Sequence, residues 1–289
     1  MSLSSRPSRT RFRISSYLEY DVEYKSTLLV NVHALKSPDQ KIISEDFSIT
    51  PEIPFAEMLT KPKLNRIYRL ETGNVPQLSI SYEATVETVH RRHSYQDIRQ
   101  TSLVKIPAEV TPYLFPSRYC QSDKLGRFAM KKFGRYRNTF SQVQAISNWI
   151  YETIEYLPGT TTPQTSAYDT ITEQAGVCRD FAHLGIALCR ALSIPARYFV
   201  GYSYLLNPQD FHACFEAYIG ERWLIFDPTR MAPVNGLVAI AHGHDAADAA
   251  TTTIFGSAQL TYMQVDCQCV KNHFKPFYRS SRTGISFSQ

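Results

Sequence analysis

Cys178 is the residue of this chain with the clearest potential for covalent chemistry. It stands in the run Gly176-Val177-Cys178-Arg179-Asp180-Phe181, where a loop gives way to an amphipathic helical pattern. The first turn of a helix carries unpaired backbone N–H groups and the positive end of the helix dipole, and both favour a thiolate. The position therefore predicts a nucleophilic cysteine, provided that a base lies nearby.

A histidine and a carboxylate follow Cys178 in the sequence, as His212 and Asp227. They lie in two short predicted strands, 212–219 and 222–227, which Gly220-Glu221 joins as a two-residue hairpin turn. In the register where Ile219 faces Arg222, His212 and Asp227 share a face and become diagonal neighbours. Cys178, His212 and Asp227 then form a candidate set of nucleophile, base and orienting group.

Helical periodicity predicts the elements that must position these residues. One helix follows Ser122 or Asp123, a second begins at about Ser141, and a third begins near Cys178 and ends before Ile194-Pro195. A strand from Arg197 to Tyr204 precedes the hairpin. The third helix is amphipathic, so we expect it to pack on the strands that follow it and to point Cys178 at His212.

The region before these helices has a different period. Residues 11–91 alternate apolar and polar positions, as at Leu78, Ile80, Tyr82, Ala84 and Val86, and turn signals separate the runs. This pattern predicts an N-terminal antiparallel β-sandwich domain over 1–110. A catalytic domain then spans 111–289, with a proline-containing linker at 111–122. The fold class is α+β.

Composition excludes several classes of protein. The chain has 289 residues, 43% of them hydrophobic and 20% charged, as in ordinary globular proteins. A net charge of +5 without a basic run argues against nucleic acid as a partner. No apolar run is long enough for a membrane span, and residues 1–6 lack a secretory signal. Six cysteines are too few for a disulfide scaffold, so a cytoplasmic location is expected.

Three segments resemble the transglutaminase-like core. They are 175–198, which contains Cys178, then Asp210-Phe211-His212-Ala213, and the stretch from Trp223 to Pro228. Together with the β-rich region ahead of them, they are most similar to the bacterial transglutaminase-like cysteine proteases. The segment Gly243-His244-Asp245-Ala246-Ala247-Asp248 departs from the family's usual pattern, which has arginine in place of His244.

The resemblance implies a papain-like core, in which a helix that carries the cysteine packs on an antiparallel sheet. It also implies Cys178 as nucleophile, His212 as base and Asp227 as orienting residue. Acyl transfer then proceeds through a thioester, which water or an amine resolves. This chemistry needs no cofactor and no metal, and its partner is a peptide or protein substrate. The backbone N–H of Cys178 is a candidate oxyanion donor, as are the side chains of Tyr156, Tyr168 and Trp149.

Two other functions are open from the residues alone. A zinc-binding module could use His212-Ala213-Cys214, His242-Gly243-His244 or Cys267-Gln268-Cys269, although structural zinc sites usually place two or more residues between paired ligands. A transglutaminase-like binding protein with an idle triad is the other alternative. Other residues near Cys178 have structural interpretations: Asp180 favours the helix dipole, His183 is a packing or surface residue, and Cys189 and Cys214 are small apolar fillers.

Overall fold

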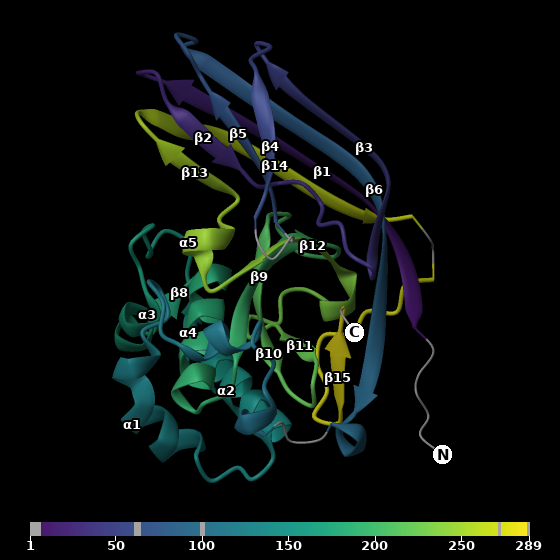
Figure 1. Ribbon diagram of the computed structural model, residues 1–289, viewed down its shortest axis with the longest axis vertical. Helices are drawn as coiled ribbons and strands as arrows, with labels where there is room; N and C mark the ends of the chain where they lie inside the picture. The colour runs from purple at the N-terminus through teal and green to yellow at the C-terminus, as the bar shows by residue number, and fades with distance from the viewer. Residues whose placement is uncertain (1–6, 61–64, 99–101, 271–272, 288–289) are drawn as a thin grey trace.

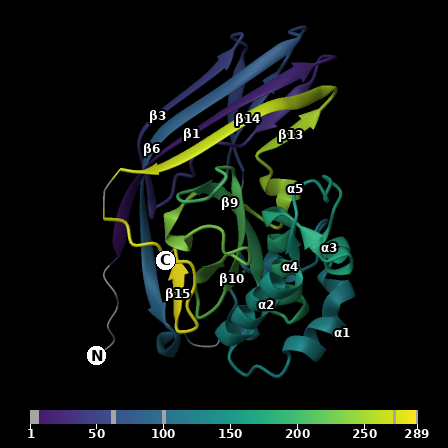
Figure 2. The same cartoon turned by 180° about the vertical axis from the view of Figure 1, so that it is seen from behind.

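The computed structural model describes residues 7–60, 65–98, 102–270 and 273–287. The expectation that residues 1–6 lack a secretory signal concerns a segment that lies outside the described residues. Within the described part, layers of β-sheet stand above a mixed helical and β core, as Figures 1 and 2 show from opposite sides. The sheets described are antiparallel except for one two-stranded parallel pair, so the α+β class is confirmed.

Two antiparallel sheets form the upper layers in Figure 1, except that β15 and the end of β6 with which it pairs run down beside the core. The larger sheet has the order β14-β1-β6-β15, and β3 also pairs with β6. The smaller sheet has the order β13-β2-β5-β4. Their bounds are β1 Ser8–Val22, β2 Thr27–Val30, β3 Gln40–Thr50, β4 Phe55–Leu59, β5 Arg66–Glu71, β6 Gln77–Ser94, β13 Thr252–Phe255, β14 Ala258–Cys269 and β15 Thr283–Ser286.

The predicted alternation along residues 77–86 is confirmed. In β6 every second side chain is buried, namely those of Leu78, Ile80, Tyr82, Ala84 and Val86. These side chains meet the smaller sheet: the Tyr82 ring lies 4.4 Å from His33, which stacks on Tyr68 of β5 at 3.8 Å. Burial of one face of each sheet against the other is the main source of stability for this layer.

The sheets of the N-terminal half are completed by strands from the end of the chain. β14 pairs with β1 along most of its length, β13 pairs with β2, and β15 pairs with the far end of β6. A domain boundary at residue 110 stays a prediction. Three strands that follow residue 250 nevertheless belong to the same sheets as the strands that precede residue 95.

The core consists of a four-stranded sheet covered by helices. Its order is β11-β10-β9-β12, and a small parallel pair, β7-β8, lies beside it. The strands are β7 Glu155–Tyr156, β8 Ala175–Gly176, β9 Ala196–Ser203, β10 His212–Tyr218, β11 Trp223–Phe226 and β12 Leu237–Gly243. The helices are α1 Ser122–Phe133, α2 Thr139–Thr153, α3 Ala167–Glu173, α4 Cys178–Ala191 and α5 Ala246–Ala249.

The helices predicted after Ser122, near Ser141 and at Cys178 are therefore present, the second beginning two residues earlier than expected. Neither α3 nor α5 was predicted. None of the helices among the described residues is long and apolar enough to cross a membrane. All six cysteines lie in the described part of the chain, and no disulfide joins them.

Polar side chains of the β layers pair with the core. Gln40 satisfies both backbone groups of Ala239 in β12, with an Nε2···O distance of 2.8 Å and an N···Oε1 distance of 2.7 Å. Asn65 does the same at His242. The buried hydroxyl of Tyr202 donates to the Val32 carbonyl at 2.8 Å. Because side-chain amides cap the edge of β12, layers and core are fixed relative to one another.

Candidate active site

The N-terminus of α4 presents Cys178 as the first helical residue. The Asp180 carboxylate accepts a hydrogen bond from the Val177 N–H at 3.0 Å and caps the helix, as expected for a carboxylate in the first turn. A Cβ on Gly176 would lie 2.9 Å from the Asp180 Cβ, so only glycine permits this close approach. The sequence around Cys178 thus fixes where the helix begins and where the thiol lies.

The predicted hairpin register is confirmed. Tyr218 pairs with Trp223 and Phe215 with Phe226, and the Ile219 N–H donates to the Arg222 carbonyl. Gly220 and Glu221 have φ of +62° and +63°, as a two-residue turn with two left-handed positions requires. Turn chemistry alone therefore specifies the positions of His212 and Asp227 on the two strands.

His212 and Asp227 are brought together as the register predicts. His212 Nε2 lies 3.0 Å from Asp227 Oδ2, and both side chains are buried. The imidazole also has a hydrogen-bonding contact with the Cys178 side chain. The structure thus aligns sulfur, imidazole and carboxylate.

α4 packs on the strands that follow it, as expected, and the structure shows which face of the sheet it covers. The body of the helix packs on the face of β10 that carries Phe215, where Gly185 allows contact with the ring. Cys214 lies on the reverse face with Phe199 and Ile225. Cys178 therefore meets His212 at the end of β10, of which His212 is the first residue.

Asp227 is held by four hydrogen bonds. Its Oδ1 accepts from the backbone N–H and the hydroxyl of Thr229, at 2.9 and 2.7 Å, and its Oδ2 accepts from His212 and from the Ala232 N–H. Burial alone would raise the pKa of Asp227, but His212 and Thr229 outweigh it and lower the pKa. The carboxylate therefore stays ionised beside the imidazole.

Burial disfavours a charged His212, but its neighbours reverse the effect. The Asp227 carboxylate and the hydrogen bonds to Asp227 and Cys178 hold the pKa of His212 well above its ordinary value. An imidazole that stays protonated is able to stabilise a thiolate and later to donate a proton to a leaving group.

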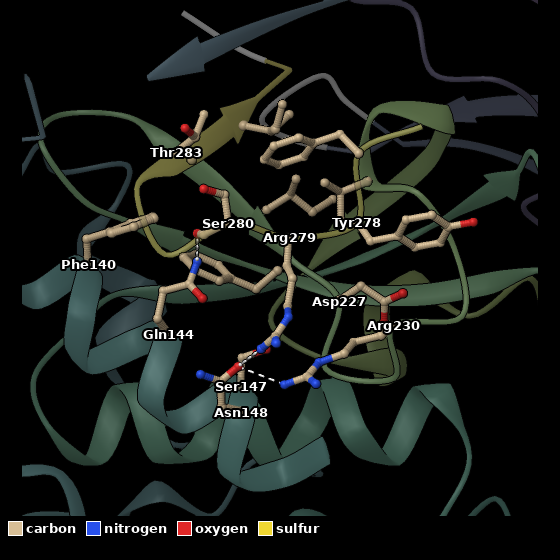
Figure 3. Close-up of a pocket in the computed structure, with 16 residues that line it drawn as sticks. Phe140, Gln144, Ser147, Asn148, Asp227, Arg230, Tyr278, Arg279, Ser280 and Thr283 are labelled. Atoms are coloured by element: carbon tan, nitrogen blue, oxygen red, sulfur yellow. Dashed lines mark hydrogen bonds between the residues drawn. The ribbon is translucent and has the colours of Figure 1, made fainter. Parts of the chain in front are cut away.

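The loop that carries Asp227 is anchored to α2, as Figure 3 shows. Arg230, three residues after Asp227, donates to Asn148 Oδ1 at 2.8 Å, and Arg279 donates to the same oxygen at 2.8 Å. The Arg230 guanidinium also lies 3.7 Å from the centre of the Tyr151 ring. Neither arginine was identified from the sequence, because nothing local indicates that residues 148, 230 and 279 meet.

Of the three side chains considered as oxyanion donors, only Tyr156 lies at Cys178. Parallel pairing of β7 with β8 sets Tyr156 beside Gly176, and its hydroxyl contacts the Cys178 backbone N–H. Burial and the nearby Cys178 raise the pKa of Tyr156 to about 12, so the hydroxyl keeps its proton. Trp149 packs instead between Phe128 and Phe133, and Tyr168 lies under the Lys124 ammonium group.

The remaining residues near the site have the structural roles expected of them. His183 is buried and stacks on Tyr119 at 5.0 Å, and Cys189 is fully buried in α4. Burial and the Asp227 carboxylate raise the pKa of Cys214 to about 12, which keeps that thiol protonated.

A metal could use only one cluster among the described residues, namely His212, Cys214 and Asp227, whose ligand atoms lie within 4.8 Å of one another. The chemistry of these donors fits a metal poorly. The Asp227 oxygens already accept four hydrogen bonds, one of them from His212 Nε2, so two of the three donors are engaged within the protein. His212 and Asp227 thus belong to a hydrogen-bonded network that does not require a metal.

Comparison with known proteins identifies the class to which this fold and site belong. Residues 127–228 match the model of the transglutaminase-like superfamily, and residues 10–109 match that of the bacterial transglutaminase N-terminal domain. A crystal structure from Cytophaga hutchinsonii, described as a candidate cysteine protease, is 50% identical. It superposes with a TM-score of 0.95 over 99% of each chain. The chain belongs to the transglutaminase-like superfamily.

Curated relatives are more distant. An uncharacterized protein of Mycobacterium leprae, ML0607, is 27% identical over 188 residues, which are 60% of this chain and 66% of that protein. Rv2569c of Mycobacterium tuberculosis is 27% identical over 142 residues, or 44% of this chain and 45% of that protein. The chain thus matches two thirds or less of the length of these relatives.

Proposed function

We propose that the protein is a cysteine-dependent acyl-transfer enzyme that acts on peptide or isopeptide amides. The observation that carries the proposal is the position of His212, hydrogen-bonded to Asp227 on one side and in contact with Cys178 on the other. The 50% identical structure from Cytophaga hutchinsonii, described as a candidate cysteine protease, supports the same class of chemistry.

In the proposed reaction, His212 holds the proton of Cys178 as an imidazolium, and Asp227 stabilises that charge. The thiolate attacks the amide carbonyl and forms a tetrahedral intermediate. The amine leaves with the proton from His212, and a thioester on Cys178 remains. Water or a second amine, deprotonated by His212, then attacks the thioester and releases Cys178.

We also propose that Tyr156 and the Cys178 backbone N–H stabilise the oxyanion. The two groups are in contact at the thiol, and the hydroxyl keeps its proton at neutral pH because the pKa of Tyr156 is about 12. A carbonyl oxygen that displaces this contact can accept from both donors. Removal of one such donor typically lowers kcat by about 10² to 10³.

Mass spectrometry of a peptide library tests the reaction class. Incubation with the enzyme should give cleaved peptides in water and amine adducts when a primary amine is added, and the ratio of the two reports the preferred acceptor. Cys178→Ala is the blank, because it removes the proposed nucleophile and keeps the Cβ of a side chain that is only partly buried against the core. Turnover that persists in Cys178→Ala would rule out the mechanism.

Labelling with iodoacetamide at neutral pH separates the enzyme from an idle member of the superfamily. We expect one equivalent to react rapidly at Cys178, which is partly exposed. Cys214→Ala is the matched control, since Cys214 is buried and its pKa is about 12. Slow labelling of the wild type, equal to that of Cys178→Ala, would favour a binding protein with an unused triad.

A further inference from the structure

Cys178 opens into a cavity of about 720 Å³ that the core shares with the β layers. One wall comes from the core strands, through Val200 and Ala213. A second wall comes from α5 and the residues that follow it, and a third is formed by residues 251–254, which include most of β13. Figures 1 and 2 show α5 and β13 directly above the end of the core where α3 and α4 lie.

The wall from α5 consists of small residues. Ala246, Ala247, Ala249 and Ala250 line the cavity. Because alanines extend only one carbon from the backbone, they leave the cavity wide. A polypeptide main chain with side chains on both sides is able to enter a cavity of this size.

β13 is an edge strand with hydrogen-bonding groups directed away from its sheet. It pairs only with β2 in the described residues, and the Asn31 N–H donates to the Thr251 carbonyl in the same register. Alternation along an antiparallel pair then directs the N–H and C=O of Thr253 toward β2. The N–H and C=O of Thr252 and Ile254 point the other way, and they form no backbone hydrogen bond to any part of the chain that is described.

We propose that the substrate is an extended polypeptide segment that binds as an additional strand along the outer edge of β13. This binding mode carries the scissile amide to Cys178. Backbone pairing to an edge strand gives affinity without requiring a particular sequence, and the cavity then selects side chains at alternate positions. This inference rests on the proposed acyl-transfer function, and it deepens that function by naming the conformation of the substrate.

Backbone N-methylation of a substrate peptide tests the proposal without altering the enzyme. The probe is a peptide recovered as cleaved from the library, synthesised with a single N-methyl group at each position in turn. Pairing with β13 predicts alternation: methylation at every second residue on one side of the scissile bond lowers kcat/KM about tenfold, because it removes a hydrogen bond and blocks the strand. The residues between these tolerate methylation. Equal effects at all positions, or none, would overturn the proposal.

Proline substitution supplies the matching test on the enzyme. Ile254→Pro removes a donor that points away from β2, a position at which an edge strand tolerates proline. Leu59→Pro is the matched control, because the pairing of β4 with β5 directs the Leu59 N–H outward at the opposite edge of the same sheet. We expect Ile254→Pro to lower kcat/KM for the peptide about tenfold and Leu59→Pro to leave it unchanged.

Hydrolysis of 4-nitrophenyl acetate distinguishes failure of this inference from failure of the proposed function. This ester is too small to pair with a strand, so its turnover by the wild type, compared with that by Cys178→Ala, reports the thiol chemistry alone. A wild type that does not turn over the ester through Cys178 contradicts the acyl-transfer chemistry. A wild type that does so, but shows no alternation with methylated peptides, contradicts binding along β13 alone.

Discussion

At the scale of single residues, the charge of His212 is set by two opposed influences. Burial in the core lowers its pKa, and the Asp227 carboxylate, together with the neighbouring Cys214 and Cys178, raises it further than burial lowers it. Asp227 can do so because Thr229 and Ala232 hold both of its oxygens in place. The sequence indicated that His212 and Asp227 form a pair, but it gave no sign of the two residues that fix the carboxylate.

Replacement of Asp227 by Asn should therefore move the pH dependence of the enzyme. Without the carboxylate, burial dominates and the pKa of His212 falls, so the imidazolium needed to protonate the leaving amine is lost at lower pH. We expect the alkaline limb of the profile of kcat/KM against pH to shift down by about one unit or more. Residual activity should exceed that of Cys178→Ala. An unshifted limb would mean that Asp227 does not control His212.

Tyr156→Phe tests the proposed oxyanion donor. The variant loses only a hydroxyl, on a ring that packs 5.8 Å from Phe181. We expect kcat on peptides to fall about a hundredfold, because a donor to the oxyanion is missing in the transition state. Labelling by iodoacetamide forms no oxyanion and should keep its wild-type rate. A matching loss in both reactions would instead indicate a role in preparing the thiol.

At the scale of elements, the turn at Gly220-Glu221 is the local feature that made the positions of His212 and Asp227 predictable from the sequence. Gly220 and Glu221 define a hairpin register without reference to the rest of the chain, and this register places His212 and Asp227. The face on which α4 docks was not predictable, because both faces of the core sheet are apolar: Phe215 lies on one and Phe199 on the other. Alternation of apolar and polar residues along these strands therefore does not indicate which face packs against α4.

Close packing of α4 on β10 depends on Gly185. A Cβ there would lie 2.5 Å from the Phe215 ring, which is buried and stacked on Phe226, so Gly185→Ala should destabilise the protein by about 1–3 kcal/mol. Gly126→Ala in α1 is the control. A Cβ at Gly126 meets no atom within 4 Å, and the better helix propensity of alanine should stabilise by about 0.5–1 kcal/mol. Chemical denaturation of both variants measures the difference.

Glu216 joins three strands of the core sheet from its reverse face. Its carboxylate pairs with Arg197 of β9 and lies 3.0 Å from His242 Nδ1 of β12. Burial alone would raise the pKa of Glu216, but Arg197 and His242 lower it to about 2. The interactions of the Glu216 carboxylate with Arg197 and His242 therefore contribute their full stability at pH values above 4.5, the ordinary pKa of a glutamate. This contribution is lost as the pH falls toward 2.

Glu216→Gln should accordingly be most damaging at neutral pH. We expect a loss in free energy of unfolding of about 3 kcal/mol at pH 7, from the size of the pKa shift, and a smaller loss at pH 3. Urea denaturation of wild type and variant at the two pH values gives the comparison. A difference that does not depend on pH would show that packing rather than charge is responsible.

At the scale of the whole molecule, the pairing of the last strands with the first could not be predicted. β14 lies beside β1 although about 240 residues separate them along the chain, and no local signal marks such a partner. The N-terminal strands were recognisable from their alternation, whereas their neighbours depend on contacts that form only in the complete fold. The cavity at Cys178 has the same origin, since residues 251–254 form part of it.

An isolated fragment of residues 1–110 should therefore not fold cooperatively. It lacks β13, β14 and β15, so one edge of β1, one edge of β2 and the far end of β6 lose their partners. We expect the full chain to unfold in a single thermal transition and the fragment to show none. A sharp transition for the fragment would instead establish 1–110 as an autonomous domain.

Completion of the N-terminal sheets by β13 and β14 also imposes an order on synthesis. A ribosome releases β1 and β2 early, together with their neighbours β6 and β5, but β14 and β13, which pair with their other edges, emerge only after the entire core has been translated. The core strands lie between β6 and β13 in the chain, and they pair with one another without any later strand. The core sheet can therefore form while one edge of β1 and one edge of β2 are still unpaired. Because β13 contributes a wall of the cavity at Cys178, this thiol is synthesised before the cavity is complete, and a nascent chain carries Cys178 without the edge strand to which we propose that a polypeptide pairs.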